Sequence, residues 1–100
     1  MKLGILVNTD RHLGHIRGLA AAAAKKNHDV VIFAMDHGVR LLDDDAFTEL
    51  ARLEGVSLSF CSHSAREQGI ETEGRLAGIT VGSQLNNAMM AQAVDRLVVL

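Results

Sequence analysis

The residue in this sequence best suited to covalent chemistry is Cys61, the only cysteine in the chain. A short apolar run, residues 56–60, leads to it, and a polar segment of helical composition follows it and stops at Gly69. This order predicts a β-strand that delivers Cys61 to the start of a helix, where backbone N–H groups lack partners. Unpaired donors and the positive end of a helix dipole both favour a thiolate. We therefore predict that Cys61 is a reactive sulfur.

The three residues after the cysteine, Ser62, His63 and Ser64, suit such a site. Either serine can cap the helix by accepting a hydrogen bond from a free N–H group. A nearby imidazole raises the thiolate content, although the ring of His63 can equally point to solvent. The alternative for Cys61 is a packed side chain that only fills space, because cysteine is among the most buried residue types.

The hydrophobic pattern predicts the elements that must position this cysteine. We expect strands over residues 2–7, 30–35, 56–60, 78–82 and 96–100, and helices over 13–26, 43–53, 62–69 and 83–93. Five strands that alternate with four helices indicate βαβ units and a parallel sheet with helices on both faces. We therefore predict one domain, residues 1–100, with a three-layer α/β/α, flavodoxin-like fold. Right-handed crossovers do not by themselves settle the strand order.

Several local signals make this prediction specific. Asp10 is placed to cap the first helix, and Asn27 to end it in a left-handed conformation. Gly38 suits a turn that needs positive φ, and Ser83 suits the start of the last helix. We expect residues 71–77 to form a loop. The last strand, Leu-Val-Val-Leu, needs neighbours on both faces.

Length and composition exclude several classes of protein. The 100 residues carry a net charge of −2, which leaves no electrostatic footprint for nucleic acid. No apolar run approaches the ~18 residues of a membrane span, and the start of the chain lacks a secretory pattern. One cysteine excludes an internal disulfide. We expect a cytoplasmic protein.

Ligands of open parallel sheets bind beyond the carboxyl ends of the strands. That rule gathers the candidate binding residues Asn8, Asp10, His12, His37, Gly38, Ser62, His63, Ser64 and Ser83 at one edge of the sheet. A second hypothesis follows, in which the protein is an oligomer that binds a small ligand and Cys61 is merely packed. Ser83 could hold an anion with the N–H groups of its helix, or could be a helix cap and nothing more.

Metal and cofactor sites have little support in the sequence. His12, His15 and His37 could join Cys61 in a zinc or copper site, but three separate loops would have to converge and no CxxC or HExxH motif is present. There is no GxGxxG after the first strand and no GxxxxGK[ST]. The acidic run 43–45 lacks the spacing of a calcium loop. We predict no cofactor and no metal.

Three segments together resemble the DsrE/DsrF/TusD-like proteins of sulfur relay. AAAAAKKNHDVVIFAMDHGVRLL is similar to that family's helix, "GHEV" strand and "DGV" turn, with Asn27 in place of the usual glycine. VSLSFCSHSAREQGI resembles the family's cysteine strand and the helix that ends in glycine. GITVGSQLNNAMMAQAVDRLVVL resembles the closing strand, helix and strand.

The resemblance implies a compact α/β/α domain that assembles into homotrimers or hexamers. It also implies that the cysteine at position 61 carries sulfur as a persulfide, received from a donor protein and passed to an acceptor protein. Independently, the stretches Leu85–Met90 and Val39–Leu42 offer more apolar surface than one small sheet can cover. We therefore expect a homo-oligomeric sulfur carrier or sulfurtransferase, with no nucleic acid and no membrane among its partners.

Overall fold

A computed structural model describes residues 1–74 and 76–100 of the chain. Its strands are β1 (Lys2–Val7), β2 (Asp29–Ala34), β3 (Val56–Cys61), β4 (Thr80–Gly82) and β5 (Arg96–Val99). Its α-helices are α1 (Leu13–Lys25), α2 (Asp45–Thr48), α3 (Ser62–Glu67) and α4 (Gln84–Ala93), and two 3₁₀ helices, η1 (Asp36–Asp43) and η2 (Glu49–Arg52), precede and follow α2. The predicted parallel α/β fold is confirmed. No helix in the described ranges is long and apolar enough to cross a membrane.

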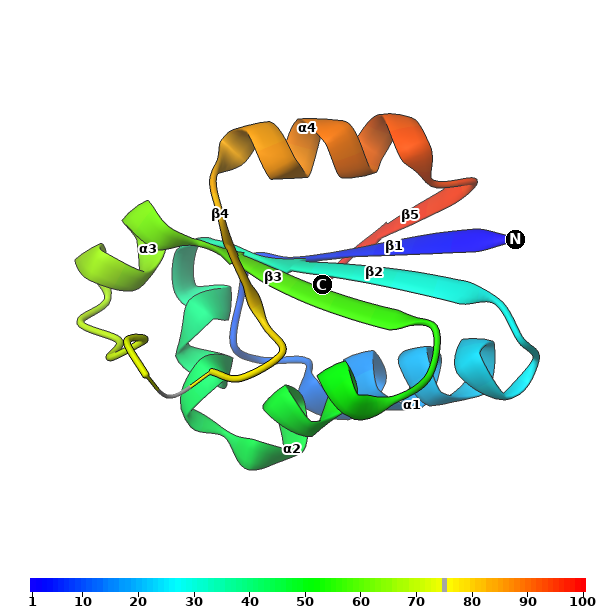
Figure 1. The fold of residues 1–100 in the computed structure, drawn as a ribbon, viewed down its shortest axis with the longest axis horizontal. Helices are drawn as coiled ribbons and strands as arrows, with labels where there is room; N and C mark the ends of the chain where they lie inside the picture. Colours follow the sequence, from blue (N-terminus) through cyan, green and yellow to red (C-terminus); the bar gives the residue numbers. More distant parts are fainter. Residues whose placement is uncertain (75) are drawn as a thin grey trace.

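The sheet has the order β4-β3-β2-β1-β5, and every pair of neighbouring strands is parallel. From β1 to β4 the chain always steps toward the same edge, so right-handed crossovers keep α1 and α2 on one face. The return from β4 to β5 reverses the direction and places α4 on the opposite face (Figure 1). The sheet therefore has helices on both faces, as predicted, and within the described residues α4 is the one helix on its face.

The main core lies between the sheet and the elements α1, η1 and α2, which cover one of its faces. Its largest fully buried side chains include Phe47 and Phe60, two of the three aromatic residues of the chain. The third, Phe33, points to the α4 face and packs in a smaller cluster with Cys61 and Met90. Cys61 therefore packs on the α4 face of the sheet, in the smaller of the two apolar clusters.

Two expectations about the segment after β2 are wrong. Gly38 does not have positive φ, whereas Asp36 does, at 49°. Gly38 is needed for space, because a Cβ atom there would lie 2.1 Å from the backbone oxygen of Val7. Val39, Leu41 and Leu42 belong to η1 and are buried in the core, so they offer no surface to a partner.

The helix termini agree with the sequence signals in part. Asn27 has φ of 63° after α1, and Ser83 caps α4 in a capping box with Asn86, both as predicted. Asp10 is not a cap, because the N-cap of α1 is His12 and the Asp10 carboxylate pairs with Arg40 instead, at 3.7 Å. The helix expected over 43–53 is shorter and divided into α2 and η2.

The expectation that the last strand is covered on both faces is also wrong. β5 is an edge strand that pairs only with β1 among the described strands. Leu97 and Val99, which share the sheet face with Leu6, are 42% and 55% exposed. On α4, Leu85 and Met89 are 68% and 61% exposed. An apolar surface therefore remains on the α4 face.

The Gly38 contact gives a test of the fold. Gly38→Ala should lower the free energy of unfolding by about 2 kcal/mol or more, because neither the Val7 carbonyl nor the 3₁₀ helix can move aside without loss of packing. Gly14→Ala is the matched control: it lies on α1 with nothing within 4 Å of the new Cβ atom, and it should stabilise the helix by about 0.5–1 kcal/mol. Urea denaturation measures both. Equal effects of the two substitutions would contradict the close approach.

Candidate functional site

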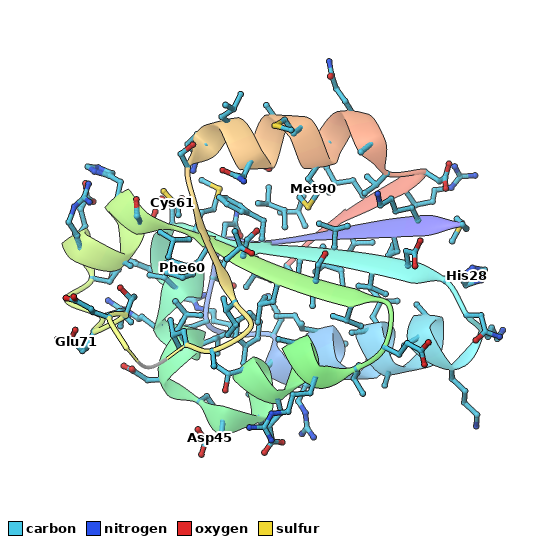
Figure 2. All side chains as sticks on the ribbon, in the orientation of Figure 1. His28, Asp45, Phe60, Cys61, Glu71 and Met90 are labelled. Atoms are coloured by element: carbon cyan, nitrogen blue, oxygen red, sulfur yellow. The ribbon has the colours of Figure 1, made fainter. Side chains whose placement is uncertain are left out.

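Cys61 is the last residue of β3 and the N-cap of α3. The residue is only 3% exposed, but it lines a cavity of about 360 Å³ at the carboxyl end of the strand. Figure 2 shows it between the start of α4 and the ribbon of α3. The cavity is lined by Met35, Asp36, Cys61, Ser62, His63, Ser64, Ser83 and Gln84. The sulfur is therefore recessed in the wall of this cavity.

Ser64 connects this cysteine to the end of β2. Its hydroxyl oxygen accepts a hydrogen bond from the backbone N–H of Asp36 at 2.9 Å. The left-handed backbone of Asp36 belongs to the turn that presents this N–H group to Ser64. Since a hydroxyl has one proton to donate, the contact with Asp36 leaves that proton for the Cys61 sulfur. The buried Ser64 side chain therefore links the end of β2 to Cys61 through two hydrogen bonds.

The pKa of the Cys61 thiol is set by two opposed influences. Burial raises it, but hydrogen bonds from the Ser64 hydroxyl and N–H, the Gln84 side chain and the His63 N–H lower it, and the net pKa lies below its ordinary value. Thiolate therefore forms at a lower pH in the folded chain than in the unfolded chain. It stabilises the fold above the ordinary thiol pKa, and this contribution is lost as the pH falls through the folded value.

The helix after the cysteine is less important than expected. α3 has six residues, too few for a large dipole, so the local donors of its first turn matter most. The prediction that Ser62 or Ser64 caps this helix is wrong, because Cys61 holds the N-cap position and Ser64 accepts from Asp36. The His63 ring is exposed, and its Nε2 pairs with Glu67 at 2.5 Å.

The far wall of the cavity comes from α4 and the end of β2, and Ser83 is its one member among the candidate binding residues named from the sequence. Ser83 lines it, as predicted, together with Gln84 and Met35. Gln84 Nε2 donates to Met35 Sδ at 3.8 Å. A signal for Gln84 was present in the sequence, since it follows the recognised cap Ser83. No pattern indicated Met35.

The structure brings together five of the predicted site residues: Cys61, Ser62, His63, Ser64 and Ser83. The other five do not line this cavity: Asn8, Asp10, His12, His37 and Gly38. Asp10 is occupied with Arg40, and Gly38 is buried against Val7. His12 and His37 are exposed, and Asn8 is half-buried. The edge of the sheet is therefore divided, with the cavity at β2, β3 and β4 and away from the end of β1.

The possible metal site from the histidines does not form. The rings of His12 and His15 lie 6.0 Å apart in an edge-to-face arrangement. Within residues 1–74 and 76–100, no group of three or more His, Cys, Asp or Glu side chains is placed to hold a metal ion.

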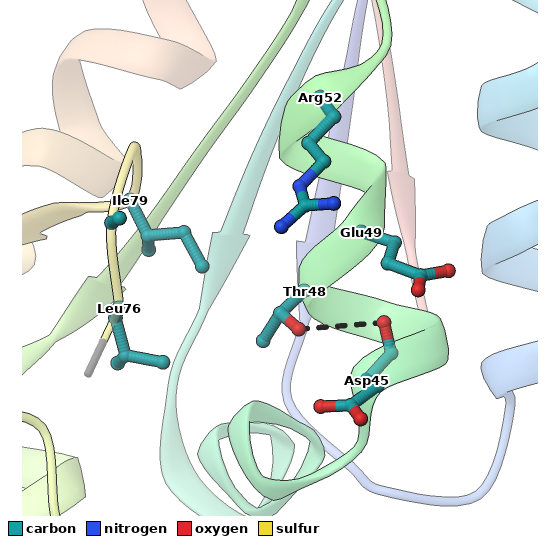
Figure 3. Close-up of a pocket in the computed structure, with 7 residues that line it drawn as sticks. Asp45, Thr48, Glu49, Arg52, Leu76 and Ile79 are labelled. Atoms are coloured by element: carbon teal, nitrogen blue, oxygen red, sulfur yellow. Dashed lines mark hydrogen bonds between the residues drawn. The ribbon is translucent and has the colours of Figure 1, made fainter.

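A second cavity, of about 290 Å³, lies between α2, η2 and residues 76–79 (Figure 3). Its wall carries Asp45, Glu49 and Arg52 opposite Leu76 and Ile79, and Thr48 Oγ1 donates to the Asp45 carbonyl at 3.4 Å. Its described lining contains no cysteine, histidine or serine that could act as a nucleophile. We therefore take the Cys61 cavity as the candidate site.

The hydrogen bond from the Ser64 hydroxyl to the Cys61 sulfur gives a test of the site. Ser64→Ala should raise the pKa of Cys61, so the midpoint of the pH–rate profile for iodoacetamide alkylation should move upward by about half a pH unit or more. Alkylation follows the thiolate fraction and therefore measures this pKa directly. Ser62→Ala is the control, since Ser62 is not among the groups that lower the pKa. An unchanged midpoint in a folded Ser64→Ala variant would contradict the hydrogen bond from Ser64 to the Cys61 sulfur.

Solved structures share this fold across the whole chain. The YchN protein from E. coli superposes with a TM-score of 0.78 at 16% identity, covering 99% of this chain and 97% of that one. BT1422 from Bacteroides thetaiotaomicron, a conserved protein of unknown function, gives 0.80 at 17%, covering 99% and 94%. MTH1491 from Methanobacterium thermoautotrophicum, also of unknown function, gives 0.70 at 19%, covering 99% and 98%.

At these identities the structural likeness establishes the fold and nothing more. No curated protein matches the chain. The family model described as the DsrE/DsrF-like family matches residues 1–100, the whole chain. The chain belongs to the DsrE/DsrF-like family.

Proposed function

We propose that this protein is a sulfur carrier in which Cys61 alternates between thiolate and persulfide. The observation that carries the proposal is the recessed Cys61 sulfur, whose pKa is lowered by donors from α3 and α4 despite its burial. A thiolate is the form of cysteine that attacks another sulfur. The cavity of about 360 Å³ leaves room beside it for one further sulfur atom and part of a donor.

The two transfers balance without an oxidant or a reductant. In loading, the Cys61 thiolate attacks the outer sulfur of a donor persulfide, a new S–S bond forms on Cys61, and the old S–S bond breaks to release the donor as a thiolate. In unloading, an acceptor thiolate attacks the outer sulfur and Cys61 leaves as a thiolate. The lowered pKa favours both attack at neutral pH and departure.

The chain has one cysteine, so it has no internal thiol to resolve the persulfide as a disulfide. The outer sulfur must therefore leave to an external acceptor, and the partners are a sulfur donor and a sulfur acceptor protein. A single free thiol with this chemistry is suited to a reducing compartment, which is why we place the carrier in the cytoplasm. Whether it turns over as a sulfurtransferase depends on the acceptor.

Mass spectrometry tests the proposal directly. Incubation with sodium tetrasulfide should add about 32 Da, one sulfur atom, to the intact chain, and the adduct should map to Cys61. A thiol reductant should remove it, because the outer sulfur is exchangeable. Cys61→Ser should show no adduct under the same conditions.

The decisive comparison is with the same chain unfolded in urea. The folded chain should load faster near neutral pH, because its thiolate fraction is higher. A folded chain that loads no sulfur, or that loads more slowly than the unfolded chain, would contradict a carrier role for Cys61.

We further propose that the protein self-associates through the apolar surface formed by Leu85 and Met89 on α4 and Leu97 and Val99 on β5. These four side chains are 42–68% exposed in the single chain. An exposed apolar edge strand invites pairing with another chain, and methionine adapts to varied partners. The family resemblance indicates a trimer or a hexamer.

A charge placed on this surface tests the assembly. Leu85→Glu combined with Met89→Glu should convert an oligomer into monomer at micromolar concentration, because two buried carboxylates would each have to be desolvated. Ala91→Glu is the control, because Ala91 is also exposed on α4 but does not share the helix face of Leu85 and Met89. Light scattering gives the mass of each variant. A monomeric mass for the unmodified chain would dispose of the proposal.

A further inference from the structure

Gln84, the first residue of α4, lines the cavity that holds Cys61. Its Nε2 donates to Met35 Sδ at 3.8 Å. Its Oε1 accepts from Asn87 Nδ2, one turn along the helix, at 3.3 Å. Since the amide oxygen is engaged by Asn87, the amide nitrogen is the end that faces the sulfur atoms.

This nitrogen carries two hydrogens and reaches two sulfurs. One hydrogen is directed at the Met35 thioether, and the Gln84 side chain also hydrogen-bonds Cys61. A thioether is a weak acceptor, whereas a hydrogen bond to an ionised acceptor is about twice as strong as a neutral one. A negative charge near Cys61 therefore competes successfully with Met35 for this donor.

The donors around Cys61 are divided between two walls. The N–H groups of His63 and Ser64 and the Ser64 hydroxyl belong to α3, which begins directly at the cysteine. Gln84 is the first residue of α4 and lines the same cavity from that helix. A second sulfur extends the side chain by about 2 Å, the length of an S–S bond. The charge of a persulfide then lies on the outer sulfur and no longer on the atom that the donors of α3 contact.

We infer that Gln84 is the hydrogen-bond donor that holds the outer sulfur of a Cys61 persulfide, with Met35 and Asn87 orienting its amide. The inference rests on the proposed function and adds to it the residue that stabilises the loaded state. Ser83, on the same wall, has a different role, because its hydroxyl accepts from the Leu85 N–H and caps α4.

Few titratable side chains line the cavity around this donor. Besides Cys61, the titratable side chains among the described lining residues are Asp36, at the end of β2, and His63, on α3, whose ring pairs with Glu67. The lining residues from α4 and its cap, Ser83 and Gln84, do not titrate. An effect of Gln84 on reactivity therefore comes from the loss of an N–H group and not from the loss of a charge.

The test compares Gln84→Met with Gln92→Met. Methionine matches the length of glutamine without its donor, and Gln92 is exposed on the same helix outside the cavity. Each variant is loaded with sodium tetrasulfide and then alkylated with monobromobimane over a range of pH. For Gln84→Met, the midpoint of persulfide alkylation should rise by about one pH unit and the loading rate should fall about tenfold. Gln92→Met should match the unmodified chain.

The outcomes separate this inference from the proposed function. If the unmodified chain loads sulfur but Gln84→Met has the same midpoint and loading rate, the role of Gln84 is overturned and the carrier proposal stands. If the unmodified chain does not load, both are overturned. Circular dichroism checks the fold, and should Gln84→Met not fold, Gln84→Leu removes the same donor without adding a charge and must raise the midpoint as well.

Discussion

The structure depends on one constraint, which is that a sulfur at the end of a buried strand must remain able to carry a charge. Burial of Cys61 opposes the thiolate, and only donors supplied at short range can reverse that effect. Three elements supply them: the first turn of α3, the Asp36 turn acting through Ser64, and Gln84 from α4. The pKa of the thiol is lowered because these elements converge on one atom.

The strand order brings these elements together. β3 lies second from the edge, between β2, which carries Asp36 at its end, and the short β4, which leads into α4. The direction of the chain reverses between β1 and β5, the usual ligand-binding position of an open α/β sheet. The cysteine cavity lies two strands away from that point. Leu97 and Val99 of β5 are exposed on the α4 face of the same sheet.

Local signals predicted the parts of this arrangement that local physics determines. Cys61 at a strand–helix junction, the Ser83 cap and the left-handed Asn27 depend on a few neighbouring residues, and all three are found as expected. The positions of Gln84 and Asp36 beyond strand ends could be predicted. Their contacts with the Cys61 site, and the place of Met35 in it, depend on which strands are neighbours and could not be predicted before the strand order was known. The need for glycine at position 38 could not be predicted either, because the space for a side chain there is taken by the backbone of Val7, in β1.

Ultraviolet titration of the folded chain tests the central claim most directly. Thiolate absorbs where neutral thiol does not, and the chain has no tyrosine or tryptophan whose signal would overlap. With Cys61→Ser as the blank, the absorbance change reports ionisation of one sulfur. The account predicts a midpoint below the ~8.5 of a free cysteine. A midpoint at or above that value would show that burial prevails over the donors, and would contradict the account.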